Sequence, residues 1–169
     1  MSRSRFYRLC IVALPCCIYH GATRAQTSVQ PVTWAASANA ETAAKPAELL
    51  KLNLEAQVAE GWHVYGLHQV DGGPTPLRIT VDEQSAVQTA GTPTGTPPVR
   101  KRDPSFGLDT ELYLHSFGLQ IPVQVKPHTA PGSQQIAVNV RFQACNDHVC
   151  LPPKTVHLTV PVQIPPSAP

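Results

Sequence analysis

Two cysteines in the last third of the chain carry the clearest chemical signal. Cys145 and Cys150 are separated by the four residues Asn-Asp-His-Val. On a helix, residues five apart point to different sides, whereas a β-hairpin with a four-residue connection places the two ends opposite each other. Asn and Asp suit such a turn. The spacing therefore predicts an antiparallel hairpin of residues 137–145 and 150–160, across which the two sulfurs form a disulfide or a redox-active dithiol.

The residues alone leave three interpretations of this pair open. A structural disulfide is the first. A redox-active pair is the second, and it is favoured by the small chain-entropy gain expected from closing so short a loop. A zinc site made of Cys145, Cys150, His148 and His157 is the third, although no second cysteine knuckle is present. His148 could stabilise a thiolate when protonated, or it could be an ordinary exposed loop histidine.

Other reaction classes lack the residues that they need. The chain contains no Gly-x-Ser-x-Gly motif, no phosphate-binding loop and no His-Glu-x-x-His motif. Trp62 is expected in the core, and the neighbouring His63 and His68 do not define a metal site. The sequence therefore gives no support for a hydrolase, and it predicts no metal and no cofactor besides the cysteine pair.

The first 25 residues are typical of a secretory signal peptide. Three arginines precede an apolar stretch at 9–19, and Thr23 and Ala25 fit the small-residue rule for cleavage after Ala25. The stretch is short for a membrane span, which needs about 20 apolar residues, although an uncleaved anchor is the alternative. We therefore expect an exported protein, periplasmic or secreted, with a single domain at 26–169 and no membrane span in the mature chain.

Removal of this leader changes the charge and the cysteine count. The whole chain has 13 Lys and Arg against 11 Asp and Glu; the leader takes away four arginines and no acid. The mature part then has 9 cations against 11 anions, a net charge of −2. No basic patch indicates nucleic-acid binding. Only Cys145 and Cys150 remain of the five cysteines, in a compartment that permits disulfides.

Short segments with alternating apolar residues indicate strands in the mature chain. The 18 prolines and 10 glycines of the whole chain are scattered, which disfavours long helices. About seven to nine strands in about 140 residues are typical of a β-sandwich. The segment 91–104 is expected to be a long loop, functional or merely solvated, because it has no strand pattern. The predicted strands are 32–36, 50–58, 62–67, 76–81, 111–117, 119–125, 136–144 and 156–162.

Several short motifs give the chain a family resemblance. It resembles the N-terminal periplasmic domain of the thiol:disulfide interchange protein DsbD over about residues 32–162. The motifs occur in the family's order, and each is weak alone but fairly specific in combination. They are Gly61-Trp62-His63-Val64-Tyr65, Asp71-Gly72-Gly73-Pro74-Thr75-Pro76, Phe106-Gly107 followed by Tyr113, and Phe142-Gln143-Ala144-Cys145 through Cys150-Leu151-Pro152-Pro153.

The resemblance implies a fold and residue roles. The fold would be an all-β, immunoglobulin-like β-sandwich. Cys150 would form the mixed disulfide with a partner, and Cys145 would resolve it. Asp103, Ser105 and Phe106 would belong to a cap loop that shields the pair, with Phe106 as the covering aromatic.

The resemblance also implies partners. In the family, a membrane-embedded electron conduit and a thioredoxin-like domain supply electrons, and the clients are thioredoxin-fold proteins such as disulfide isomerases and cytochrome c maturation proteins. This sequence carries neither donor, so its electron source would be a separate protein. Its cysteine gap is one residue shorter than in the best-known members, and Ser105-Phe106 leaves one aromatic where the cap has two.

These expectations leave two functions open. The first is an exported thiol–disulfide exchange protein that relays reducing equivalents to thioredoxin-fold partners. Whether it would be an enzyme, as a protein-disulfide reductase, or a redox carrier is open. The second is a non-enzymatic immunoglobulin-like binding or adaptor module with a structural hairpin disulfide.

Overall fold

A computed structural model describes residues 30–38 and 47–166 of the 169-residue chain. The predicted signal peptide lies outside these residues. The described part contains twelve strands and no helix, and therefore no helix long and apolar enough to cross a membrane. The strands are β1 (Val32–Ala38), β2 (Leu49–Val58), β3 (His63–Tyr65), β4 (Arg78–Val81), β5 (Val87–Thr89), β6 (Thr94–Gly95), β7 (Val99–Asp103), β8 (Leu108–Tyr113), β9 (Phe117–Val125), β10 (Gly132–Phe142), β11 (Ala144–Cys145) and β12 (Lys154–Ile164).

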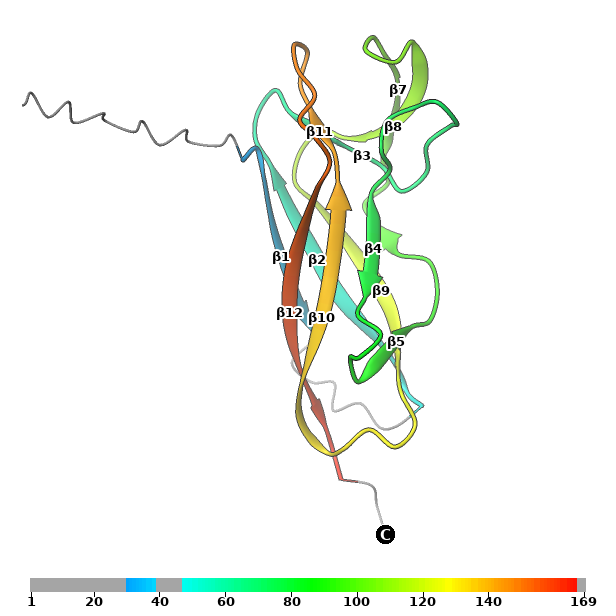
Figure 1. The fold of residues 1–169 in the computed structure, drawn as a ribbon, viewed down its shortest axis with the longest axis vertical. Coiled ribbons are helices and arrows are strands. Elements are labelled where there is room, and N and C mark those ends of the chain that lie inside the picture. Colours follow the sequence, from blue (N-terminus) through cyan, green and yellow to red (C-terminus); the bar gives the residue numbers. More distant parts are fainter. Residues whose placement is uncertain (1–29, 39–46, 167–169) are drawn as a thin grey trace, which may run out of the picture.

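The strands form three antiparallel sheets (Figure 1). One sheet has the order β1-β2-β9-β5, with β6 also paired to β9, and a second has the order β12-β10-β4. Their apolar faces contribute to one core cluster. The third sheet, β11-β3-β8-β7, lies at one end of the domain, the upper end in Figure 1. The fold is the all-β, immunoglobulin-like β-sandwich expected from the sequence.

The core follows from the two-residue period of the long strands. Alternate residues of a strand point to opposite faces of a sheet, so one face can be apolar throughout. On β2, β9 and β10 the apolar set is buried, while the residues between are more exposed. The buried residues are Leu50, Leu52, Leu54 and Ala56 of β2, Leu119, Ile121, Val123 and Val125 of β9, and Ile136, Val138, Val140 and Phe142 of β10.

The structure corrects two of the predicted boundaries. The segment 91–104, predicted to be a loop, contains β6 and β7. Four of the five side chains of β7 are exposed, so this edge strand has almost no apolar face to reveal it. The break predicted at Gly118 falls instead between Tyr113 and Phe117, because Gly118 lies within β9.

The end sheet positions the cysteine region. β10 pairs with β12 as far as Phe142, and the chain then shifts so that β11 pairs with β3. β3 also pairs with β8, which in turn pairs with β7. The cysteine hairpin and the turn between β7 and β8 are therefore held on opposite sides of the short central strand β3.

Candidate functional site

The cysteine hairpin has the predicted form. Cys145 and Cys150 are paired across an antiparallel bridge and joined by a disulfide, with their Cα atoms 4.1 Å apart. The Asn146 N–H donates to the Val149 carbonyl at 2.9 Å. The Asn146 side-chain oxygen accepts from the N–H groups of His148 and Val149 at 2.9 and 2.8 Å. An asparagine that binds the backbone ahead of it in this way stabilises a tight turn.

The two sulfur-bearing residues differ in exposure. Cys145 is 1% exposed, whereas Cys150 is partly exposed. Both belong to a small apolar cluster, separate from the main core, with Tyr65, Leu112 and the partly buried Phe106. Cys150 is therefore the more accessible of the two cysteines.

The predicted cap loop is the turn between β7 and β8. Asp103 ends β7, and its Oδ1 accepts hydrogen bonds from the N–H groups of Ser105 at 2.8 Å and Phe106 at 3.3 Å. The Gly107 N–H donates to the Asp103 carbonyl at 2.8 Å, with a φ of 66° that glycine adopts without strain. Asp103 is only 3% exposed, so its buried carboxylate anchors the loop.

Tyr65 of β3 links this loop to the disulfide. Its side chain is fully buried, and its hydroxyl donates to Asp103 Oδ2 at 2.8 Å. The same hydroxyl lies 4.0 Å from the Cys150 sulfur. The Phe106 ring meets the Tyr65 ring edge-on, with centroids 6.0 Å apart. Reduction or modification of Cys150 can therefore affect Asp103, which anchors the loop, through the Tyr65 hydroxyl.

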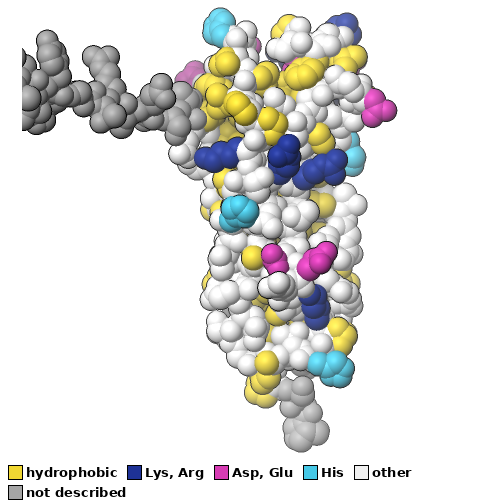
Figure 2. Space-filling view, in the orientation of Figure 1, with side chains coloured by type: hydrophobic (Ala, Val, Ile, Leu, Met, Phe, Trp, Pro, Cys, Tyr) yellow, Lys and Arg dark blue, Asp and Glu magenta, His cyan; other side chains and the backbone are white. Residues whose placement is uncertain are grey.

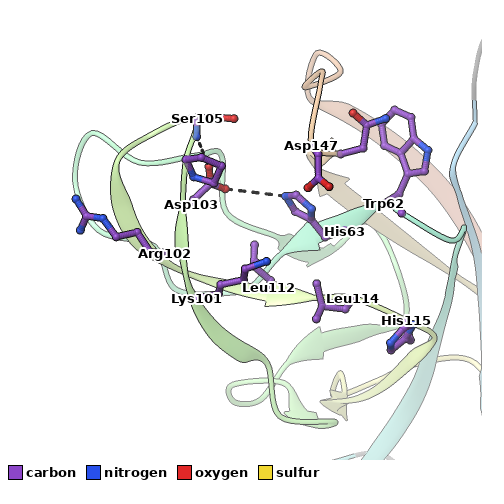
Figure 3. A pocket seen from close by; sticks show the side chains of 13 residues that line it. Trp62, His63, Lys101, Arg102, Asp103, Ser105, Leu112, Leu114, His115 and Asp147 are labelled. Atoms are coloured by element: carbon purple, nitrogen blue, oxygen red, sulfur yellow. Dashed lines mark hydrogen bonds and ion pairs between the residues drawn. The ribbon is translucent and has the colours of Figure 1, made fainter.

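A cavity of about 250 Å³ lies between the cap and the hairpin (Figure 3). Its lining includes His63, Asp103 and Ser105, with Asp147 from the hairpin. His63 Nε2 is 4.0 Å from Asp103 Oδ2, and it has no hydrogen-bond partner within the described part of the chain. The space leaves the cap free of tight packing on this side.

Burial changes the acidity of two of these groups. Burial lowers the pKa of His63 below its usual 6.5, although the nearby Asp103 carboxylate opposes this. Burial, followed by the hydrogen bond to Asp103, raises the pKa of the Tyr65 phenol above its usual 10.0. At neutral pH the Tyr65 hydroxyl therefore keeps its proton and remains a donor.

We expect His63 to make the fold less stable in acid. In the pH range between the lowered pKa of folded His63 and the unfolded value of 6.5, the unfolded chain binds a proton that the folded chain does not. The contribution of neutral His63 to the free energy of unfolding is therefore fully present above pH 6.5, and it is lost as the pH falls towards the lowered pKa of the folded protein. Urea unfolding of the oxidised protein at pH 7.5 and pH 5 measures this loss, which should be smaller in His63→Leu.

The exposed hairpin histidine offers a matched control. His148→Gln removes a histidine from the hairpin turn, and it should keep the acid sensitivity of the wild type. A loss of stability that is equal in wild type and His63→Leu would contradict the assignment to His63.

The remaining predicted site residues have different positions. Ser105 is exposed in the cap, and its N–H binds Asp103. His148 is exposed at the hairpin turn, and no hydrogen bond joins its ring to a sulfur among the described residues, so its tuning role stays a prediction. The zinc alternative was wrong in its ligand set, because His157 lies on β12 with Nδ1 2.6 Å from Asn139 Oδ1. No group of three metal-ligating side chains gathers in the described ranges.

Two residues of the site were not assigned to it from the sequence. Tyr65 and His63 both belong to the motif Gly61-Trp62-His63-Val64-Tyr65, but the sequence gives neither of them a role at the cysteine pair. Their shared signal is position: they flank Val64 on a three-residue strand between the hairpin and the cap. Their connection to Asp103 joins residues 38 or more positions apart, and no local pattern reveals it.

The domain is therefore an immunoglobulin-like β-sandwich that carries a cysteine pair, here a disulfide, beneath an anchored loop. The profile of the family described as thiol:disulfide interchange protein DsbD, N-terminal, matches residues 27–161, which is more than half of the chain. The chain belongs to this family. Its membership supports a thiol–disulfide exchange role for the cysteine pair.

Two solved structures are similar to the chain. The DsbD N-terminal domain of Neisseria meningitidis in the reduced form has a TM-score of 0.48 and 18% identity, and the match covers 67% of this chain and 78% of that one. The N-terminal periplasmic domain of ScsB from Proteus mirabilis has a TM-score of 0.47 and 18% identity, covering 76% of this chain and 44% of that one. No curated protein matches the chain.

Proposed function

We propose that the protein is an exported thiol–disulfide exchange protein that passes reducing equivalents to thioredoxin-fold partners. The observation that carries the proposal is the unequal exposure of the two cysteines: Cys145 is 1% exposed, and Cys150 is partly exposed beneath the cap. A disulfide that served only to staple the hairpin would need no such difference. Family membership supports the exchange chemistry.

The first step is attack by reduced Cys150 on a disulfide of the partner. The Cys150 thiolate forms a bond to one partner sulfur, and the bond between the two partner sulfurs breaks. The other partner sulfur leaves as a thiolate and takes a proton. The Phe106 loop would open for this step, since the ring packs in the same cluster as the sulfurs.

The second step is resolution by Cys145. Its thiolate attacks the Cys150 sulfur of the mixed disulfide, and the partner leaves as a dithiol. Two electrons have then moved to the partner, and Cys145–Cys150 is oxidised as in this structure. This step is intramolecular, and the 4.1 Å between the two Cα atoms holds the sulfurs close enough to react without a large rearrangement.

A reductant must then restore the dithiol. A thioredoxin-like donor or a membrane electron conduit would supply two electrons to Cys145–Cys150. A periplasmic location agrees with the related ScsB domain, which is described as periplasmic. Cytochrome c maturation proteins and disulfide isomerases are the client classes that we propose.

The reduction potential of the disulfide tests this function. Protein from the exported fraction is equilibrated in thiol buffers of graded potential, the free thiols are alkylated, and the alkylated fraction is measured by mass spectrometry. We expect a potential above about −300 mV, because structural disulfides in secreted proteins usually lie below that value. A lower potential, with no reaction between the reduced protein and a small disulfide, would support the binding module instead.

A further inference from the structure

Three exposed cations lie side by side across the β12-β10-β4 sheet: two are ladder partners on its outer face, and the third, on the edge strand β12, is opposite the buried Phe142. They are Lys154 of β12, Arg141 of β10 and Arg78 of β4, and all three are exposed. Figure 2 shows Lys and Arg side chains in a row across this face, below a surface rich in hydrophobic side chains at the hairpin end. Since neighbouring strands lie about 4.8 Å apart, the row spans about 10 Å.

The row carries unbalanced positive charge. Arg78 and Arg141 are directly opposite in the β4–β10 ladder. Like charges in that position repel and destabilise the pairing. None of the ion pairs found in the described ranges includes Arg78, Arg141 or Lys154. An acid at either ladder position would remove the repulsion, so the arrangement indicates a use for positive charge at this surface.

An apolar pocket connects the row to the cysteine hairpin. The pocket has a volume of about 480 Å³, and Phe142, Ala144, Leu151, Pro152 and Lys154 are among its lining residues. Ala144 and Leu151 are the direct chain neighbours of the two cysteines, and Lys154 belongs to the row. The pocket therefore lies between Lys154 and the base of the cysteine hairpin.

We infer that this surface binds an extended acidic segment of the exchange partner, with one apolar side chain in the pocket. This inference rests on the proposed function, because the partner's cysteine must reach Cys150 while the segment is bound. Arg141 is four residues from Cys145, or about 13 Å along an extended strand. A partner segment of about four residues beyond its reactive cysteine spans that distance and brings carboxylates onto the row.

The charge of the surface selects this occupant. Without the predicted leader of residues 1–25, the chain has a net charge of −2, so long-range attraction of an acidic partner must come from a local cluster such as this one. The apolar pocket also requires an apolar side chain in the ligand, and a simple anion has none. The position beside the hairpin ties the surface to thiol exchange rather than to an unrelated ligand.

The test compares two activated peptides. Each carries one cysteine linked to 5-thio-2-nitrobenzoate and one leucine, together with two glutamates or two lysines. Attack by reduced Cys150 on the peptide sulfur forms a protein–peptide disulfide and expels 5-thio-2-nitrobenzoate, whose absorbance gives the rate. We expect the glutamate peptide to react about tenfold faster at low salt, and the ratio to approach one at high salt.

Charge reversal assigns the preference to the row. Arg141→Glu should lower the rate ratio to about one, whereas Lys51→Glu, an equal charge change on the other large sheet, should keep it. Because the new glutamate faces Arg78, the melting temperature of Arg141→Glu should be no lower than that of the wild type. If Arg141 had only a structural role, Arg141→Glu would lower both the rate ratio and the melting temperature.

A neutral small disulfide separates the two levels of the argument. The reduced protein could react with 2,2′-dithiodipyridine and also react at equal rates with both peptides. That result would overturn the docking surface and leave the proposed function intact. No reaction with the small disulfide would overturn the proposed function, and the docking surface with it. A glutamate preference that Arg141→Glu retains would also refute the assignment to the row.

Discussion

Replacement of Cys145 by serine is expected to leave the protein covalently linked to its partners. Cys150 can still attack a partner disulfide, but no thiolate remains to resolve the product. The exported fraction should then contain mixed disulfides that disappear on reduction, and mass spectrometry should identify thioredoxin-fold proteins in them. Recovery of none would count strongly against the relay.

Replacement of Cys150 is the matched control. Cys145 is 1% exposed, so in Cys150→Ser the remaining sulfur is shielded from partners and no mixed disulfide should form. Both variants lose the same disulfide, which for so short a loop is worth about 2 kcal/mol of stability. Unequal trapping therefore reports on access to the sulfurs and not on folding. Equal trapping by the two variants would contradict the assigned order of attack.

The long strands could be predicted because each buries one face. β2 buries every second residue from Leu50 to Ala56 and β10 every second residue from Ile136 to Phe142, so their periodicity is readable without a structure. β7 could not be predicted, since it pairs only with β8 and buries just Asp103. β5 is three residues long and buries only Val87. Hydrophobic periodicity thus detects strands that bury a whole face against the core, and it misses strands such as β5 and β7 that bury a single side chain.

The cysteine hairpin was predictable, whereas the network around it was not. Asn146 and Asp147 between two cysteines provide a local turn signal, and the turn forms as expected. The hydrogen bond from Tyr65 to Asp103 joins β3 to the cap across 38 positions. It depends on how β3 and β7 flank β8, and this sheet order is a tertiary property. The family resemblance places Asp103 in the cap. It does not predict that the buried Asp103 carboxylate accepts a hydrogen bond from Tyr65.

The buried carboxylate leads to a second large effect, on the reactivity of reduced Cys150. Tyr65 Oη is 2.8 Å from Asp103 Oδ2 and 4.0 Å from the Cys150 sulfur, so charge and sulfur are at most about 7 Å apart. At an effective dielectric constant of about 20, that separation disfavours a thiolate by about 2 kcal/mol. Asp103→Asn removes the charge and so favours the thiolate. Because a thiolate of lower pKa is also a weaker nucleophile, we expect a net rate about tenfold higher for reduced Cys150 with iodoacetamide at neutral pH.

The pH dependence of that reaction separates charge from cover. Asn keeps an oxygen that can accept from the Ser105 and Phe106 N–H groups, so the cap turn should persist and the rate profile should move to lower pH. Phe106→Ala removes part of the cover without changing the charge, and it should raise the rate by the same factor at every pH. If Asp103→Asn also raised the rate uniformly, loop opening would explain its effect. If it left the rate unchanged, Asp103 would act on the cap alone, and the Tyr65 hydroxyl would not couple the cap to the sulfur.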